Sequence, residues 1–441
     1  MTKSFVCLAV LSIAIGLAAC GSDIDEPWAL HDVTVVDVRE GTTVPERTLL
    51  IRGTRIVAVL SSEGGPPTGL RSVDGTGGFV IPGLFDMHAH MVGVAPGPTP
   101  IDPMRYLRVG VLGLRDLGAP VDSILAFQRR LATSTSPRAW FTGPILDSLP
   151  RDLTHLFMQV ASPARASEAV DLVAENGWVS VKVSDWIPLH IYTALAREAR
   201  IRGVPLAGHV PHDVPLSLVI EAEQRSIEHL GGLPHGILRA CSRNRPPAMP
   251  GLTGPTESDR YLAVMSSDFI SPLVDGFDEE RCRGVARQLA AAEVWQVPNL
   301  TLWRFWAESP PAADTPENRA AFERVFRLNG EIVRLMAEEG VPIMTGIDEV
   351  PGASIHDELQ LLVSAGLSPL EALRSATIRP AEFLAVSDSL GSLFEGGLAD
   401  FLVLDQNPLD DISATSQIRS IALGGELFDL VDGELIQLGR R

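Results

Sequence analysis

Hydrophobic and polar residues alternate along the chain with two different periods, and the period changes twice. Between residues 28 and 80, Val, Ile and Leu alternate with polar residues, as in VTVVDV and TRIVAVL, and Gly and Pro residues separate the short runs. Alternation with period two is typical of strands that bury one face. Because no helical pattern interrupts these runs, residues 28–80 predict a small unit built of β-strands.

From Gly83 to about residue 385, short apolar runs alternate with longer segments rich in Ala, Leu, Arg and Glu. WVSVKVSD, GVPLAGHV and VPIMTGID have the length of buried strands, whereas PLHIYTALAREARIR has the periodicity of a helix. Strand–helix alternation over roughly 300 residues is typical of an α/β fold, the (β/α)8 TIM barrel. The pattern distinguishes six or seven of the eight strands.

The alternating pattern returns near the C-terminus, in GLADFLVLD and SIALGGELFDLVDGELI. We expect residues 21–82 and 386–441 to form one small β-sandwich, and residues 83–385 to form the barrel. One connection inside the barrel, residues 231–293, is rich in Pro, Ser, Arg and Gly. Because loops of this length in compact domains are usually functional, we interpret it as a lid or a small subdomain.

The first twenty residues, MTKSFVCLAVLSIAIGLAAC, differ from the rest. A lysine precedes a short apolar run that ends in small residues, which is typical of a secretory signal peptide and too short for a spanning helix. The final LAAC resembles a bacterial lipobox, which implies cleavage before Cys20 and lipidation of that cysteine. We therefore expect a signal peptide at residues 1–20 and an exported lipoprotein, anchored in the cell envelope through its N-terminal lipid. In a Gram-negative cell it would lie in the outer membrane and face the periplasm. The alternative is a plain signal peptide with a chance cysteine.

The net charge limits the classes of binding partner, and the cysteines can be interpreted once the cellular compartment is considered. The 441 residues include 36 basic and 55 acidic side chains, and the net charge of −19 would repel phosphate backbones, so we exclude nucleic acid as a partner. With Cys7 in the signal peptide and Cys20 lipidated, Cys241 and Cys282 remain. In an exported and oxidising setting they either form a disulfide or stay as two separate buried thiols.

Titratable residues occur at the ends of the predicted barrel strands. His88 and His90 close the first strand, and because they are two residues apart both imidazoles lie on one face. Barrel enzymes keep their chemistry at the C-terminal ends of the strands. The candidate metal ligands are His88, His90, Lys182, His209, His229 and Asp348. Any one of them alone would more often be an ordinary core or loop residue, but six together at this end of the barrel predict a metal site.

Lys182 is the unusual member, because a charged lysine is costly to bury inside a barrel. Alternation in VSVKVSD places Lys182 on the face opposite to Val181 and Val183. Reaction of its amine with CO₂ would give a carbamate anion that can bridge two cations and removes this cost. The alternative is a lysine that extends to solvent at the strand end.

Taken in order, these motifs resemble the amidohydrolase superfamily, in the imidazolonepropionase-like branch that includes prolidase-type dipeptidases. The resemblance rests on DGTGGFVIPGLFDMHAH, LRDLG, VKV, GHV, IEHL, TGID, LSPLEALRSATIRPAEFL and GGLADFLVLDQNPLDDI. It implies two divalent metal ions: one held by His88, His90 and Asp348, and one by His209 and His229. A carbamate on Lys182 and a hydroxide would bridge them. Zinc is the expected ion, since imidazole and carboxylate ligands suit it.

The resemblance also implies a binuclear metal-dependent hydrolase of C–N bonds, with a small amide or peptide as substrate, such as a dipeptide or an N-acyl amino acid. A bridging hydroxide would attack the carbonyl, and Asp348 would shuttle the proton to the leaving nitrogen. A lactonase, a cyclic-amide hydrolase or a phosphotriesterase could use the same metal centre. A non-catalytic surface lipoprotein on this fold is a further alternative.

Substrate contacts are less marked in the sequence. The resemblance implies a substrate role for His155, in RDLTHLF near where relatives often carry Gly-Gly-His, and the alternative is an ordinary loop histidine. Arg304 follows the seventh predicted strand, where its guanidinium either binds a carboxylate bidentately or points to solvent. Trp186 and Trp303 follow predicted strands, so we expect them to form apolar walls at the barrel mouth. Assembly into a homo-oligomer stays open.

Overall fold

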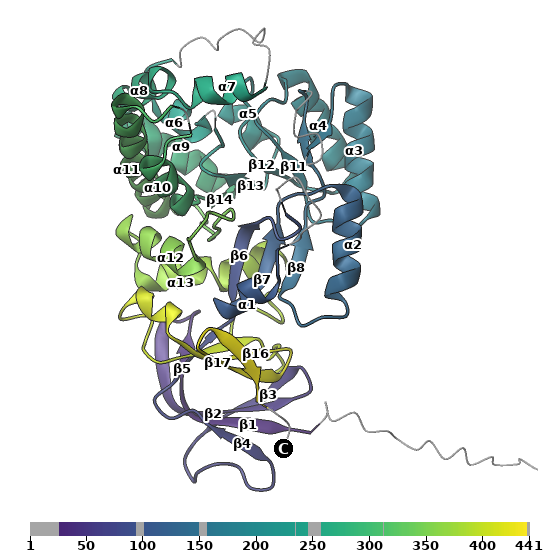
Figure 1. The fold of residues 1–441 in the computed structure, drawn as a ribbon, viewed down its shortest axis with the longest axis vertical. Helices are drawn as coiled ribbons and strands as arrows, with labels where there is room; N and C mark the ends of the chain where they lie inside the picture. Colours follow the sequence, from purple (N-terminus) through teal and green to yellow (C-terminus); the bar gives the residue numbers. More distant parts are fainter. Residues whose placement is uncertain are drawn as a thin grey trace, which may run out of the picture.

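The computed structural model describes residues 26–93, 101–149, 157–233, 235–245, 257–311 and 313–438. The predicted signal peptide, Cys20 and His155 lie outside the described residues. Figure 1 shows a β unit at the lower end of the molecule and a strand core surrounded by helices above it. Within the described residues, no helix combines the length and apolar character needed to cross a bilayer.

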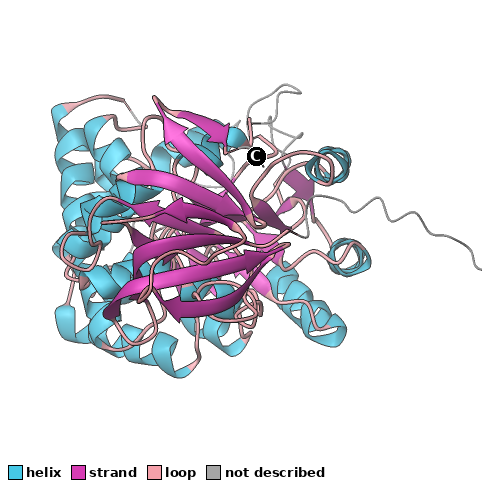
Figure 2. Ribbon diagram, turned by 90° about the horizontal axis from the view of Figure 1, so that it is seen from below, coloured by secondary structure: helices cyan, strands magenta, loops and turns pink. Residues whose placement is uncertain are grey.

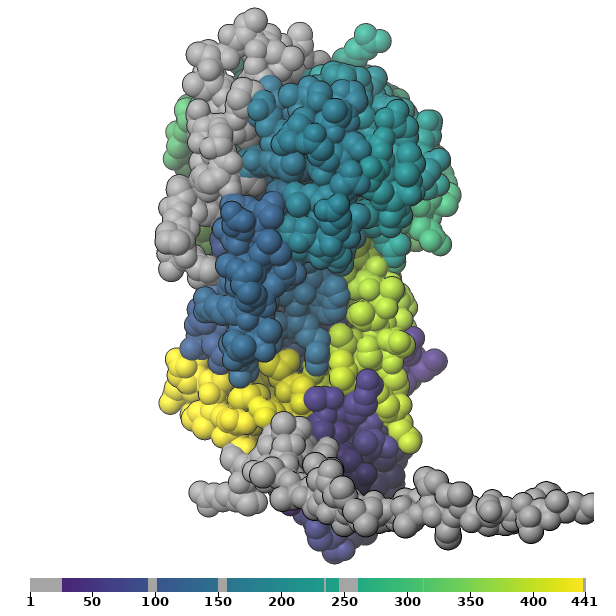
Figure 3. Space-filling view, turned by 90° about the vertical axis from the view of Figure 1, so that its right-hand side faces the viewer, coloured from purple at the N-terminus to yellow at the C-terminus, as the bar shows by residue number. Residues whose placement is uncertain are grey.

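The β unit combines both ends of the chain in one sheet of nine strands, as predicted. Its path runs β18-β17-β16-β15-β5-β1-β2-β3, and β4 pairs with β1. The N-terminal strands are β1 (Trp28–Asp37), β2 (Thr42–Arg52), β3 (Arg55–Ser61), β4 (Arg71–Asp74) and β5 (Phe79–Pro82). The C-terminal strands are β15 (Phe401–Leu404), β16 (Ile418–Leu423), β17 (Glu426–Val431) and β18 (Glu434–Gln437). The two sets meet where β5 pairs antiparallel with β15, and Figure 3 shows the purple and yellow segments at the same end of the molecule.

The sheet folds over an apolar core of its own, which gives the β-sandwich. Trp28, Leu30, Val33 and Val35 of β1 all belong to this core. Leu30 and Val33 are three residues apart, and a register shift between them lets both face inward. Figure 2, viewed from the sandwich end, shows the long strands crossing in front of the helices.

The barrel strands are parallel and short. They are β6 (Leu84–Ala89), β7 (Val111–Asp116), β8 (Arg138–Phe141), β9 (Ile145–Asp147), β10 (Phe157–Gln159), β11 (Val181–Val183), β12 (Leu206–Gly208), β13 (Ser226–Glu228) and β14 (Trp295–Val297). β6, β7 and β8 form one sheet, and β9, β11, β12, β13 and β14 follow one another in a second, in which β10 pairs with β9. β8 pairs with β7 whereas β9 pairs with β11, so these two pieces together occupy the third strand position.

The eighth strand position closes the barrel through a few hydrogen bonds. Gln296 of β14 bridges to Ile343 in parallel. On the other side, the Met87 amide of β6 donates to the Thr345 carbonyl at 2.9 Å. These contacts complete the ring of strands, so the predicted (β/α)8 barrel is confirmed.

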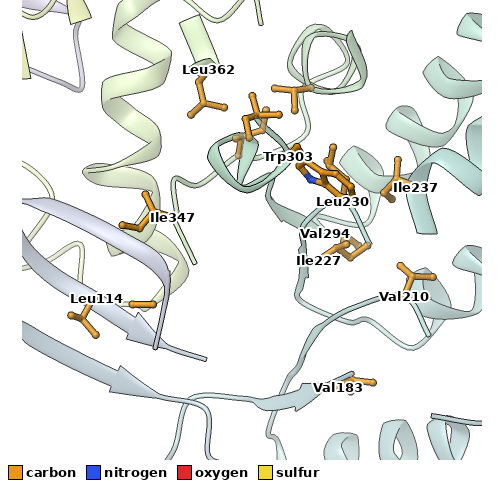
Figure 4. Close-up of a cluster of buried hydrophobic side chains, with 14 of the residues drawn as sticks. Leu114, Val183, Val210, Ile227, Leu230, Ile237, Val294, Trp303, Ile347 and Leu362 are labelled. Carbon is orange, nitrogen blue, oxygen red and sulfur yellow. The ribbon is translucent and has the colours of Figure 1, made fainter. Parts of the chain in front are cut away.

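Helices cover the outside of the barrel and bury its outward-facing strand residues. They are α1 (Met104–Arg108), α2 (Val121–Leu131), α3 (Pro163–Glu175), α4 (Leu189–Arg202), α5 (Leu216–Glu221), α6 (Gly236–Cys241), α7 (Glu257–Val264), α8 (Ser267–Asp275), α9 (Glu279–Ala291), α10 (Leu300–Glu308), α11 (Pro316–Glu338), α12 (Ile355–Ser364), α13 (Pro369–Ser375) and α14 (Ile378–Phe383), with a short 3₁₀ helix, η2 (Ile412–Ser416). Figure 4 shows Val183, Ile227 and Val294 in the buried cluster that joins strands and helices.

The segment between β13 and β14, residues 231–293, is more regular than its composition suggested. Where the structure describes it, it contains α6, α7, α8 and α9. A disulfide between Cys241 and Cys282, with Cα atoms 4.4 Å apart, joins α6 to α9. The backbone beside it is also tied, because the Asp278 amide donates to the Cys241 carbonyl at 3.1 Å.

A candidate metal centre at the barrel mouth

The structure brings the six candidate ligands together at one end of the barrel. His88 lies in β6 and His90 directly follows that strand. Lys182 is the middle residue of β11, whereas His209 and His229 directly follow β12 and β13. Asp348 follows the eighth strand position, and its amide donates to the His88 carbonyl at 2.8 Å. Because the strands are parallel, their C-terminal ends all open into the same mouth.

His88, His90 and Asp348 form the tightest group. Asp348 Oδ1 lies 3.3 Å from His88 Nε2 and 3.2 Å from His90 Nε2. One ligand atom from each of the three side chains lies within 4.8 Å of the other two. Imidazole nitrogens and a carboxylate oxygen at such spacing can converge on one metal ion.

His209 and His229 extend the cluster. The His229 ring lies 4.3 Å from that of His88 and 5.3 Å from that of His209, centroid to centroid. His229 Nε2 is 3.7 Å from Asp348 Oδ2. Asp348 therefore offers one oxygen to each half of the cluster.

Lys182 lies inside the barrel and is 2% exposed. Among the described residues, its Nζ has no hydrogen-bond partner. Burial lowers the pKa of this amine to about 8, although Glu228 and Asp348 oppose the shift. A neutral amine is the form that reacts with CO₂, so the environment of Lys182 suits carbamate formation.

The electrostatics of His88 and His229 favour the neutral imidazole, which is the form that binds metal. At His90 burial lowers the pKa, but the hydrogen bond to Asp348 and its charge outweigh burial and raise it. Burial lowers the pKa of His229 to about 3, and neighbouring His209 and Lys182 act in the same direction. Burial likewise holds the pKa of His88 well below its usual value. These imidazoles, the Asp348 carboxylate and the unpaired Lys182 amine form a donor set that fits divalent cations.

Hydrogen bonds at Nδ1 orient three of the four histidines. His88 Nδ1 donates to Glu228 Oε2 at 3.2 Å, His90 Nδ1 donates to the Gly118 carbonyl at 3.2 Å, and His209 Nδ1 donates to Asp185 Oδ1 at 2.6 Å. Each bond leaves Nε2 as the free ligand atom. Glu228 and Asp185 are therefore part of the site, and neither was predicted from the sequence.

A buried ion pair holds Glu228 in place. Arg115 Nη2 donates to Glu228 Oε1 at 2.9 Å, and Ser226 Oγ donates to the same oxygen at 2.6 Å. Arg115 Nε also donates to the Met87 carbonyl at 2.8 Å. Arg115 thus links β7, β13 and β6 beneath the histidines.

Asp86 supports the backbone of the site. Its Oδ1 accepts from the His88 amide at 3.0 Å and from the Ile347 amide at 3.3 Å. The carboxylate therefore connects the first and eighth strand positions, next to His88 and Asp348.

The candidate substrate contacts are placed less favourably. Arg304 Nη2 lies 3.3 Å from Asp357 Oδ1, so its guanidinium already has a carboxylate partner. Trp303 is 1% exposed and packs against the rings of His235 and Trp306, which makes it a core residue. The expectation that Trp303 lines the mouth is wrong, because α10 begins at Leu300 and its buried face carries this indole.

Comparisons with known proteins agree with this geometry. A sequence model of the amidohydrolase family matches residues 318–427 of this chain. Ochratoxinase from Aspergillus niger is 37% identical over 94 residues, which cover 20% of this chain and 20% of that protein. The alignments with the first curated relatives thus span about a fifth of those relatives' length.

Two solved structures resemble the whole fold. A Xaa-Pro dipeptidase with bound methionine has a TM-score of 0.67 at 18% identity, covering 92% of this chain and 100% of that chain. The ochratoxinase structure from A. niger has a TM-score of 0.66 at 17% identity, covering 92% of this chain and 96% of that chain. The partial family match, these shared folds and the His-His-Asp group at the barrel mouth support the predicted resemblance to the amidohydrolase superfamily.

Proposed function

We propose that this protein is a binuclear metal-dependent hydrolase of C–N bonds in small amides, with dipeptides or N-acyl amino acids as substrates. The observation that carries the proposal is the buried Lys182 amine, which has no hydrogen-bond partner among the described residues and belongs to the cluster of four histidines and Asp348. A lone lysine in such a position would be costly, whereas a carbamate between two cations would not.

Lys182 has a second unusual property. Lys3 and Lys182 are the only lysines in the sequence, and all other basic side chains apart from histidine are arginines. A guanidinium stays charged in proteins and cannot take the place of a neutral amine. Lysine at this position therefore matches a requirement for amine chemistry rather than for positive charge.

The proposed metal arrangement follows the two halves of the cluster. His88, His90 and Asp348 would hold one ion, His209 and His229 would hold the other, and carbamylated Lys182 would bind both. When bound, the ions, for which we propose zinc, would supply Lewis acidity and an activated water.

Asp348 is placed to move the proton. His88 and His90 flank its Oδ1, which leaves the carboxylate between both halves of the site. It can accept a proton from the attacking water and donate it to the leaving nitrogen. An amine is a poor leaving group unless it is protonated, so this residue favours amide cleavage over the lactonase and phosphotriesterase alternatives.

A cavity beside the cluster suits a small apolar substituent. It has a volume of about 250 Å³ and is lined by residues that include Leu149, Trp186, Ile187, Ile191 and His212. Asp185, which orients His209, also lines it. A dipeptide side chain or an acyl chain would fit such a cavity. The fold shared with a Xaa-Pro dipeptidase supports the same substrate class.

The lysine content makes the carbamate directly testable. Lys3 lies in the predicted signal peptide, so cleavage of that peptide would leave Lys182 as the one lysine of this sequence. Protein prepared in ¹³CO₂ should therefore give a single lysine-carbamate signal in ¹³C NMR. Lys182→Ala should lose that signal and lower kcat/KM by at least about a hundredfold. Short carboxylic acids should restore part of the activity, because they can occupy the space left by the carbamate.

A second variant at the same position tests whether carboxylic acids restore activity only by filling the space left by the lysine side chain. Lys182→Arg fills the same space with a side chain that cannot form a carbamate, so it should be inactive and should not respond to carboxylic acids. Full activity in Lys182→Ala, or a single tightly bound metal ion in the wild-type protein, would refute the binuclear proposal. A metal-loaded enzyme that ignores amides but opens lactones or phosphotriesters would refute the substrate class only.

The lipid anchor is a separate proposal that rests on the sequence. Cys20 should be the first residue of the mature protein and should carry a lipid. Mass spectrometry of the N-terminal peptide from membrane fractions would detect the modification, and an unmodified Cys20 would contradict the anchor.

A further inference from the structure

A helix of the segment between β13 and β14 contacts one half of the candidate metal centre through the Asp185 carboxylate. Tyr261, on α7, donates its hydroxyl to Asp185 Oδ2 at 3.0 Å. The other oxygen, Asp185 Oδ1, accepts from His209 Nδ1 at 2.6 Å. Asp185 itself is fully buried. A chain of two hydrogen bonds thus connects a helix of this segment to a candidate ligand.

The beginning of the same segment encloses this carboxylate–imidazole pair from another side. Gly232 has φ +79°, and a Cβ built on it would lie 2.5 Å from Asp185 Oδ1 and 2.6 Å from His209 Nδ1. No side chain fits there unless the pair moves. The segment therefore approaches Asp185 and His209 at two places that are well separated in the sequence.

Two features hold Tyr261 in position. Its ring packs edge-on against the Trp186 indole, with centroids 6.1 Å apart. The ends of the segment around it are joined by the Cys241–Cys282 disulfide and by the bond from the Arg243 amide to the Gly276 carbonyl at 2.7 Å. These contacts therefore hold the Tyr261 hydroxyl in place next to Asp185.

We propose that Tyr261 is a positioning residue for the second metal ion, which it acts on by fixing Asp185 and, through Asp185, the His209 imidazole. The proposal rests on the binuclear centre proposed above. A carboxylate that accepts from Nδ1 fixes both the tautomer and the ring orientation of a metal-binding histidine. A second hydrogen bond to the same carboxylate removes its freedom to rotate. In this role, α7 supports part of the metal site from outside the barrel strands.

The experiment compares metal affinities at the two sites. The apo-protein is titrated with Co²⁺ in competition with a chelator, and the absorption spectrum is followed for each equivalent bound. Tyr261→Phe removes only the hydroxyl, and we expect it to weaken the second equivalent by about 10- to 100-fold, with the first unchanged. Asp185→Asn should weaken the second equivalent at least as much, because His209 then loses its carboxylate partner.

Leu262→Ala is the matched control on the same helix. Leu262 follows Tyr261 and is 46% exposed, so its truncation perturbs α7 without touching Asp185. Both equivalents should bind to this variant as they do to the wild-type protein. Wild-type affinity for both equivalents in Tyr261→Phe, or an equal loss at both sites, would overturn the inference. A wild-type protein that binds one equivalent would overturn the binuclear centre, and the inference with it.

Discussion

Glu358, a buried residue of α12, stabilises the start of α10 near the barrel mouth. Its two oxygens accept from the Leu300 and Thr301 amides at 2.8 and 2.7 Å, so it caps the N-terminus of α10. Asn299, the residue before this helix, makes no side-chain cap of its own. Burial raises the pKa of Glu358 to about 7, although the bonds from the Thr301 and Leu300 amides favour the charged form.

This shift predicts a pH-dependent stability. The carboxyl group binds its proton more tightly in the folded protein than at the ordinary pKa of 4.5. As the pH rises from 4.5 through 7, the folded state must therefore lose a proton that it holds better than the unfolded state does. That should lower the free energy of unfolding by up to about 3 kcal/mol.

Glu358→Gln should remove this dependence. In chemical denaturation at about pH 5 and about pH 8, the variant should gain roughly 2 to 3 kcal/mol relative to the wild-type protein at the higher pH. A difference between the two proteins that does not change with pH would contradict the assignment. Glu382→Gln, at an exposed position on α14, is the control for the substitution itself.

At the residue scale, the sequence predicted the candidate metal ligands better than the carboxylates that orient them. His88, His209 and Asp348 could be recognised because each is a titratable residue at the end of an apolar run. Glu228 ends one such run and Asp185 follows another, but their role depends on which imidazole a different strand places opposite them. Such pairings between strands are set by the tertiary fold and leave no local pattern.

At the scale of elements, the first barrel strand is buried on both faces, so alternation is hard to recognise in its sequence. Phe85 and Met87 belong to a cluster with Val297, Met344 and Phe383, the last residue of α14. The register of this strand also shifts between Asp86 and Ala89, and an irregularity in a strand changes which residues share a face.

The helices of residues 231–293 were also hidden in the sequence. The composition of the whole segment suggested a loop, but α9 has a clear start, where the Asp278 side chain accepts from the Arg281 amide at 2.8 Å. The eighth strand position, by contrast, is less regular than its sequence predicted. Its apolar run predicted a strand, yet the structure has a single bridge at Ile343, next to Pro342, which has no amide hydrogen to donate.

The disulfide of this segment should contribute strongly to stability. It joins cysteines 41 residues apart, and closing a loop of that length stabilises a fold by about 4 kcal/mol in the chain-entropy model. The double variant Cys241→Ser, Cys282→Ser should show that loss in urea denaturation. Wild-type protein unfolded with reductant present is the matched control and should give the same value. An unchanged free energy of unfolding in the double variant would contradict the prediction.

At the scale of the whole molecule, the sandwich and the barrel share one apolar core. Leu402 and Ile418 of the sandwich sheet belong to the same buried cluster as the barrel residues. Gly110, which precedes β7, approaches them so closely that a Cβ on it would lie 2.6 Å from Leu402 Cδ1. Arg138 of β8 and Asp400 add an ion pair across the boundary, with Nε and Oδ2 2.6 Å apart.

This shared core predicts that the two parts unfold together. Domains joined by a small polar interface melt separately, whereas those joined by a large apolar one do not. Calorimetry of the wild-type protein should therefore show one transition whose calorimetric and van't Hoff enthalpies agree. Leu402→Ala should lower the free energy of unfolding by about 2 to 5 kcal/mol, since this side chain is fully buried at the boundary. Leu60→Ala, at an exposed leucine of β3, should change it by less than about 0.5 kcal/mol. Two resolved transitions in the wild-type protein would show that the sandwich is stable without the barrel, contrary to this prediction.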